Sequence, residues 1–232
     1  MAENKKKNEA LELEEAITKS EAFVLKYKKQ LIGGISAVIL LIAGILCYQN
    51  YYAQPREDKA SAAMAKAEEN FRNNEYELAL NGNEGAAGFT QIMKDYSGTD
   101  AANLANAYAG LCYANLGKWQ EAVKYLDEFS PEGDAMISPA LLAALGNAYA
   151  NTKNLDKAVE TMKKAAAEAD SEAKDGVNNS FSPTYLLRAA DILLAQNKND
   201  EALAIYQDIK KKYVNSMAYQ EIDKYIERAS QK

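Results

Sequence analysis

The residue types that carry most enzyme chemistry are missing or isolated in this chain of 232 residues. The sequence has no histidine, which excludes histidine-based acid–base catalysis, Ser-His-Asp and Cys-His nucleophile systems, and His-ligated metal sites. Its two cysteines are not expected to pair, because Cys47 lies in an uncharged run and Cys112 between apolar residues of a predicted helix. The sequence therefore predicts no catalytic, cofactor or metal site, and the protein is not expected to be an enzyme.

Two short segments resemble ligand sites at first sight. Asn81–Gly88 has glycines at three-residue spacing, but a phosphate loop needs a preceding strand and a suitably placed Lys or Ser/Thr, so we predict a loop between helices. Asp170, Glu172 and Asp175 do not have the spacing of an EF-hand loop, so they are predicted to form a solvated acidic turn.

The overall charge limits the class of partner. Lysine and arginine number 27 and aspartate and glutamate 33, a net charge of −6, with the acidic excess strongest beyond residue 52. Binding to nucleic acid needs a basic face, so no nucleic-acid partner is expected. Apolar residues make up 48% of the chain, enough to bury a core.

A long uncharged segment divides the chain. The 26 residues between Lys29 and Arg56 carry no formal charge, and their densest apolar part, residues 31–48, would span roughly 27 Å as a helix. Three tyrosines follow it, as in an interfacial aromatic belt, and Pro55 is expected to end the helix. A buried core helix is the alternative, but this run is apolar on all sides, which favours a membrane span.

The flanking charges predict the orientation. Lysines at 26, 28 and 29 precede the span, which places residues 1–29 in the cytoplasm as a helical stub, residues 30–54 in the membrane as a signal anchor, and residues 55–232 across it. A cleaved signal peptide is disfavoured, because about thirty residues precede the apolar core and no Ala-x-Ala site follows. The stub is read either as a partner-docking helix or as a solvated spacer.

The part beyond residue 57 shows helical apolar spacing and repeats itself. Three pairs of identical residues keep one offset of 36 residues: Gly110 and Gly146, Tyr113 and Tyr149, Ala122 and Ala158. A helix-breaking turn is expected at residues 116–118 in the first of these units and at residues 153–154 in the second.

These units resemble the tetratricopeptide repeat (TPR), a pair of antiparallel helices of 34 residues. The resemblance implies that the glycines and alanines let the two helices approach closely and that the tyrosines fill the space between them. Weaker units flank the strong ones, with Ala79 and Ala202 in place of Ala122 and with insertions predicted at 81–88 and 175–181. The expected fold is all-α, with one transmembrane helix followed by a solenoid of about four helix pairs and a capping helix over 217–229.

The whole layout is similar to single-span TPR proteins of Gram-negative inner membranes, one family of which is an ancillary subunit of the Sec translocon. This resemblance implies an inner-membrane adaptor that binds proteins or peptides in the periplasm, with translocon and periplasmic chaperone components among its partners. The alternative is a structural component of an envelope assembly that associates with copies of itself.

A TPR stack offers a concave face lined by the first helix of each pair, suited to an extended peptide or a helix. Gripping of a C-terminal carboxylate is disfavoured, because only Asn147 and Arg188 fall where such TPRs use polar residues. Transferring the repeat register predicts these protein-binding residues: Tyr108, Leu111, Asn115, Asn147, Asn151, Leu187, Arg188 and Asp191.

The charge flanks make the topology testable. A periplasm-active reporter fused after Lys232 is expected to be active and a cytoplasm-active one silent, because the lysines before the span should stay in the cytoplasm. Activity of the cytoplasmic reporter alone would reverse the orientation, and extraction of the protein by alkaline carbonate would contradict the anchor.

Overall fold

The computed structural model describes the backbone of residues 2–131 and 133–231, and the side chains of this range from residue 23 onward. The chain forms two compact units, Met1–Pro55 and Arg56–Lys232. The first unit contains helix α1 (Ala2–Tyr48), followed directly by the π-helical turn η1 (Gln49–Ala53).

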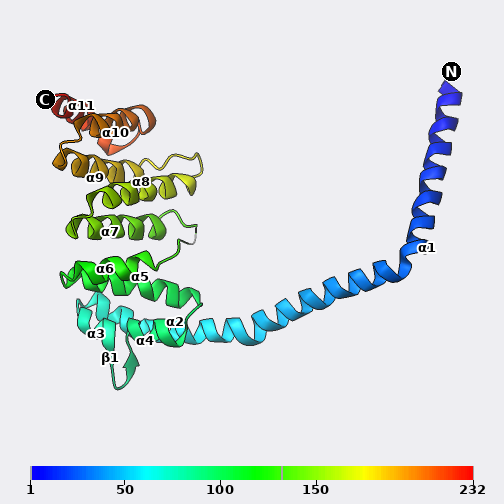
Figure 1. Ribbon diagram of the computed structural model, residues 1–232, viewed down its shortest axis with the longest axis horizontal. Coiled ribbons are helices and arrows are strands. Elements are labelled where there is room, and N and C mark those ends of the chain that lie inside the picture. Colours follow the sequence, from blue (N-terminus) through cyan, green and yellow to red (C-terminus); the bar gives the residue numbers. More distant parts are fainter. Residues whose placement is uncertain (1, 132, 232) are drawn as a thin grey trace. The chain divides into compact units, whose positions relative to one another are not determined.

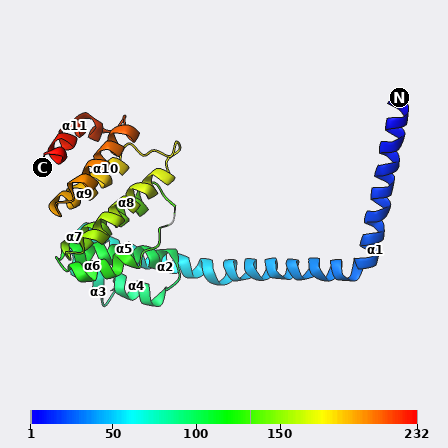
Figure 2. The ribbon, with the colours of Figure 1, turned by 45° about the horizontal axis from the view of Figure 1, so that its top comes forward.

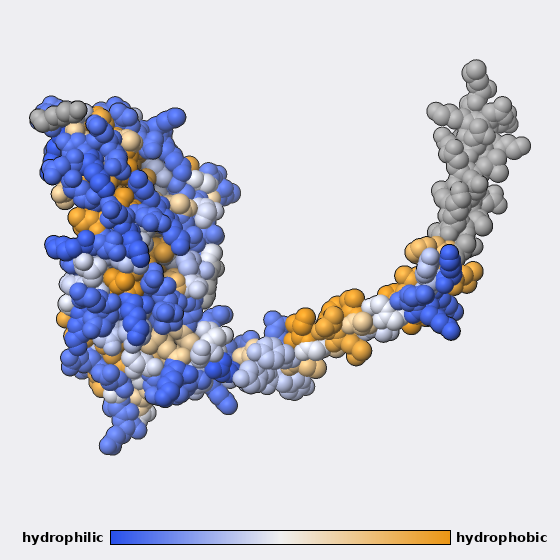
Figure 3. All heavy atoms as spheres, in the orientation of Figure 1, coloured by the Kyte–Doolittle hydropathy of each residue, from blue (hydrophilic) through white to orange (hydrophobic). Residues whose placement is uncertain are grey.

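The apolar part of α1 has no partner among the described residues. Its large apolar side chains from Ile32 to Leu46 are all more than half exposed, and Figure 3 shows apolar atoms around this stretch of the helix. By length and composition, it is the one helix in the described part of the chain that could cross a membrane.

Pro55 does not end the helix, contrary to the prediction. In η1 the hydrogen bonds run one residue further than in an α-helix, so that the backbone N–H of Gln54 donates to the carbonyl oxygen of Gln49. Helix α2 (Gln54–Arg72) follows η1 without a gap, and Pro55 is its second residue. Proline has no backbone N–H to donate, and the π-helical turn just before it replaces the regular α-helical hydrogen bonds at this point.

The second unit is a row of helical hairpins closed by one further helix (Figures 1 and 2). The first hairpin pairs α2 with α3 (Tyr76–Asn81) and α4 (Phe89–Asp95). The next three pair α5 (Asp100–Asn115) with α6 (Trp119–Asp127), α7 (Ile137–Asn151) with α8 (Leu155–Ser171), and α9 (Ser182–Ala195) with α10 (Asn199–Lys212). Helix α11 (Met217–Ser230) packs against α10 with Ile222 and Ala229 buried, as predicted for a cap.

The turn inside each hairpin has one and the same geometry. Each contains a residue with positive φ, between 59° and 71°, whose N–H bonds the carbonyl three residues back, while the next N–H bonds the carbonyl five residues back. These residues are Asn74, Gly117, Lys153 and Asn197. Their separations are 43, 36 and 44 residues, so the four predicted repeats and their insertions are in the correct register.

Small residues bring the two helices of a hairpin together, as predicted. A Cβ atom on Gly110 of α5 would overlap Leu126 of α6, and one on Gly146 of α7 would press on Met162 of α8. The alanines at equivalent positions of the second helices are all fully buried: Ala79, Ala122, Ala158 and Ala202.

The insertion at 81–88 lies between α3 and α4 but is not a plain loop. Strands β1 (Gly82–Asn83) and β2 (Ala86–Ala87) pair antiparallel, with Gly82 opposite Ala87. Gly82 (φ +71°) and Gly88 meet so closely that a Cβ on either would overlap the backbone of the other. The three-residue glycine spacing therefore closes the base of a two-stranded hairpin, a role that depends on a contact between the two ends of the segment.

The two hairpin glycines should respond differently to alanine. Gly110→Ala is expected to destabilise the protein by about 1–3 kcal/mol, because its Cβ would meet Leu126 down to the backbone nitrogen at 3.0 Å. Both substitutions gain about 1 kcal/mol of helix propensity, but Gly146→Ala should cost less, since its Cβ meets only the flexible side chain of Met162, at 3.1 Å or more. Thermal melts of the full chain, followed by circular dichroism, give the comparison, and equal melting temperatures for the two variants would contradict this packing.

Candidate protein-binding face

The first helices of the four hairpins present equivalent side chains in rows. Because the four turns coincide, positions separated by 43, 36 and 44 residues correspond to each other along the stack. One row contains Glu68, Leu111, Asn147 and Asp191, the next Ala65, Tyr108, Ala144 and Arg188, and the third Arg72, Asn115, Asn151 and Ala195. All the predicted binding residues except Leu187 therefore belong to three rows on α2, α5, α7 and α9.

Five of the predicted residues are exposed, namely Asn115, Asn147, Asn151, Arg188 and Asp191. The amide nitrogen of Asn115 donates to the carbonyl oxygen of Leu111 at 2.8 Å, and that of Asn151 does the same to Asn147 at 2.9 Å. Equivalent asparagines in neighbouring repeats are thus held in the same way against their own helices.

Tyr108 belongs partly to the core. Its ring stacks on Phe89 with centroids 5.0 Å apart and meets Phe71 edge-on at 5.1 Å, so it joins the first hairpin to the second. Burial, with a smaller contribution from the carboxylate of Glu68, raises the pKa of its hydroxyl. The half-buried Leu111 and Leu187 likewise pack against core clusters, so these three residues offer only part of their surface to a partner.

A hollow of about 400 Å³ opens between α2, α5 and the start of α7. From α2 it takes side chains at spacings of four, three and four residues: Glu57, Ser61, Met64 and Glu68. Its other lining residues are Asp100, Ala101, Leu104, Phe129, Asp134, Ile137 and Ser138. The hollow therefore combines apolar side chains with four carboxylates, and none of the described residues that line it is basic.

Two of these carboxylates hold helix N-termini. The Glu57 oxygens accept the backbone N–H groups of Asp100 at 2.8 Å and Ala101 at 2.9 Å, at the start of α5. Asp134 accepts those of Met136 and Ser138, each at 2.9 Å, and that of Ile137, at the start of α7. Burial alone would raise the pKa of Asp134, but these bonds and one from the Ser138 hydroxyl hold it below its ordinary value.

Arg56 completes the attachment of α2 to the connection between α4 and α5. Its guanidinium donates to the carbonyl oxygens of Ser97 at 2.6 Å and Asp95 at 3.0 Å, while Glu57 binds the start of α5. The Arg56 guanidinium thus binds carbonyl groups at and just after the end of α4, and the Glu57 carboxylate binds N–H groups at the start of α5. In the sequence, Arg56 and Glu57 stand out only as the first charged residues after the uncharged run.

The acidic hollow was not predicted, because the predicted binding residues all lie on the three later hairpins. The offset of 43 residues that relates Ala79 to Ala122 also relates Glu57 to Asp100 and Glu68 to Leu111. Applying this 43-residue offset to the predicted binding residues would have extended the predicted binding face to the first hairpin.

A larger hollow, of about 750 Å³, lies between α8, α9 and α10, and three lysines, Lys163, Lys211 and Lys212, line it. Its wall includes Asp170, which is only 7% exposed, so the prediction of a solvated turn is wrong for this residue. Glu172 and Asp175, also assigned to that turn, are exposed.

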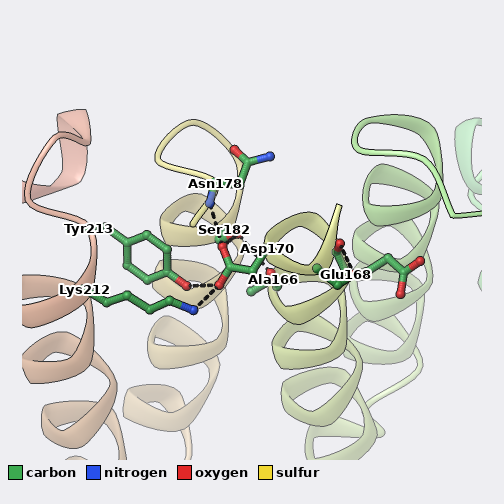
Figure 4. A network of polar contacts seen from close by, with 8 residues as sticks. Ala166, Glu168, Asp170, Asn178, Ser182, Lys212 and Tyr213 are labelled. Carbon is green, nitrogen blue, oxygen red and sulfur yellow. Dashed lines mark hydrogen bonds and ion pairs between the residues drawn. The ribbon is translucent and has the colours of Figure 1, made fainter. Parts of the chain in front are cut away.

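The Asp170 carboxylate connects three elements of the fold (Figure 4). It accepts hydrogen bonds from the Tyr213 hydroxyl at 2.6 Å, the Ser182 hydroxyl at 2.7 Å and the Asn178 backbone N–H at 2.8 Å, and it pairs with Lys212. Burial alone would raise the pKa of Asp170, but these donors outweigh burial and lower it. Burial and the bond to Asp170 also raise the pKa of Tyr213.

The lowered pKa makes the contribution of Asp170 depend on pH. The ionised form is favoured in the folded state, so its stabilisation is complete above the ordinary Asp pKa of about 4 and is lost as pH falls through the lowered value. Asp170→Asn should therefore cost about 1–3 kcal/mol of unfolding free energy at pH 7 and progressively less in acid. Denaturant titrations at several pH values measure this, with the exposed Asp175→Asn as control, and an equal loss at every pH would contradict the assignment.

Cys112 is not placed to act as a nucleophile. Burial raises the pKa of the Cys112 thiol to about 12, so it stays protonated at neutral pH. The described part of the chain has no group of three or more His, Cys, Asp or Glu side chains that could hold a metal ion.

Comparison with known proteins agrees with this geometry. A family model of the tetratricopeptide repeat matches residues 108–130, which include α6, and residues 184–216, which include α10. No curated protein matches the chain. The hairpin of α7 and α8 has the same turn as the two matched regions. The chain therefore carries tetratricopeptide repeats, which here build an all-α solenoid.

Proposed function

We propose that this protein is a membrane-anchored adaptor whose first-helix face binds segments of other proteins in the bacterial periplasm. TPR repeats indicate protein partners in general. The observation that carries the proposal is the row of equivalent positions Glu68, Leu111, Asn147 and Asp191, which runs across all four hairpins. A row of mixed polar and apolar side chains at regular intervals suits an extended or helical peptide segment.

Anchoring follows from the unpartnered apolar stretch of α1. Residues 30–54 would form the span, residues 1–29 would lie in the cytoplasm, and residues 55–232 would form the binding domain outside the inner membrane. The lysines before the span and the acidic residues after it support this orientation. A tether of this kind would keep the binding face close to the membrane surface, where secreted chains emerge.

The partners that fit this placement are components of the secretion machinery and periplasmic chaperones. The layout of one span followed by TPR repeats, similar to the ancillary Sec-translocon subunit, supports them. The adaptor would hold a client or a chaperone at the translocon without catalysing a reaction itself.

Photo-crosslinking in living cells tests the binding face. A photoreactive residue at Asn147 or Asp191, both exposed on first helices, is expected to give adducts with secretion components. The same residue at Lys124 or Glu160, exposed on second helices, should give few. Equal adducts from both helices, or adducts only from residues 1–29, would contradict the proposal, and adducts with copies of the chain would support self-association instead.

A single substitution gives a quantitative check. Arg188→Ala should weaken client capture about five-fold, because an interface arginine that is truncated commonly costs about 1 kcal/mol or more. The exposed Lys124→Ala is the matched control, and equal capture by both variants would remove Arg188 from the site.

A further inference from the structure

The acidic hollow between α2, α5 and the start of α7 has a chemistry different from the rest of the face. Met64 and Leu104 give it apolar side chains on facing helices, and Ile137 at its edge is 56% exposed. The four carboxylates Glu57, Glu68, Asp100 and Asp134 surround them. An occupant must therefore be partly apolar, and it must not be acidic.

The four carboxylates divide into two kinds. Glu57 and Asp134 accept backbone N–H groups and build the walls. The Asp100 side chain has no ion pair with any residue that the structure describes, and Glu68 has only an exposed Arg72 at 3.7 Å. Asp100 and Glu68 are thus the two carboxylates placed to receive positive charge from outside the chain.

These two carboxylates lie toward opposite ends of the hollow. Asp100 adjoins Glu57 through its backbone N–H, and Glu68 is eleven residues further along the same helix as Glu57. Eleven residues of α-helix span roughly 16 Å, the length of about five residues of an extended peptide. Two cations in an extended segment would meet both carboxylates if about four residues separated them.

The opposite hollow supplies an internal contrast. It lies between α8, α9 and α10, and its charged lining residues are Lys163, Lys211 and Lys212 with Asp170 and Asp208; Lys212 is already paired to Asp170. The first-helix hollow, lined by carboxylates and by no basic residue among those described, is therefore the more favourable of the two for a basic segment.

We propose, resting on the protein-binding function proposed above, that the first-helix hollow binds an extended segment of a partner protein with a lysine or arginine at each end and apolar side chains between them. The cations would pair with Asp100 and Glu68, and the apolar side chains would lie over Met64 and Leu104. Because the charges are near the surface, binding weakens as salt rises.

Peptide binding to the full chain in nanodiscs of neutral phosphatidylcholine tests the proposal. The probe is a fluorescein-labelled peptide with two lysines separated by four apolar residues, and empty nanodiscs correct for binding to lipid. The double variant Glu68→Gln/Asp100→Asn should bind this peptide at least about ten-fold more weakly than the natural chain. The control Glu121→Gln/Glu160→Gln removes the same charge from exposed positions on second helices and should leave the affinity unchanged.

Three results would overturn the proposal: no binding of the lysine peptide, equal binding of a peptide with glutamate in place of lysine, or equal weakening by both double variants. Crosslinking from Asn147 and Asp191 in cells separates this failure from that of the general function. If those adducts persist while the lysine peptide fails, the adaptor function stands and the assignment of the hollow falls. If the natural chain gives no adducts from these positions, the binding face itself is wrong.

Discussion

The close approach of two helices within each hairpin is the contact on which the rest of the structure depends. At Gly110 and Gly146 no side chain separates the helices, so Leu126 and Met162 reach the opposite backbone. A turn with one left-handed residue then reverses the chain in the same way each time. Identical turns keep equivalent residues in register, and that register is what aligns side chains into rows across the first helices.

Neighbouring hairpins share apolar clusters, and polar contacts at the helix ends join them further. Glu57 and Asp134 bind the starts of α5 and α7, and Asp170 holds the start of α9 to the end of α10. Helix termini leave backbone groups without partners, so a carboxylate placed there stabilises the junction while the connecting loop can vary in length. The insertion at 175–181 lies at such a junction, where Asp170 accepts the hydroxyl of Ser182 at the start of α9.

The carboxylates around the acidic hollow have two kinds of surroundings. Glu57 and Asp134 accept hydrogen bonds from backbone N–H groups. Asp100 and Glu68 line the same hollow, and their carboxylates are not used in this way within the described part of the chain. Arg56 and Glu57, the first residues after the uncharged run, fasten α2 to the next hairpin. The unit Arg56–Lys232 thus begins with residues that attach α2 to the next hairpin, shortly after the π-helical turn Gln49–Ala53.

Local pattern and repetition in the sequence were enough to determine the helical hairpins, their register and the apolar stretch of α1, because helix periodicity and a fixed offset depend on neighbouring residues alone. Tertiary structure decided what depends on distant partners. It buried Asp170 among donors from three elements, drew Tyr108 between Phe71 and Phe89, and closed a β-hairpin through the contact of Gly82 with Gly88. It also placed Glu68 and Asp100, which are 32 residues apart in the sequence, in the lining of one hollow. This depends on the packing of α2 against α5, which puts both carboxylates near the same apolar side chains.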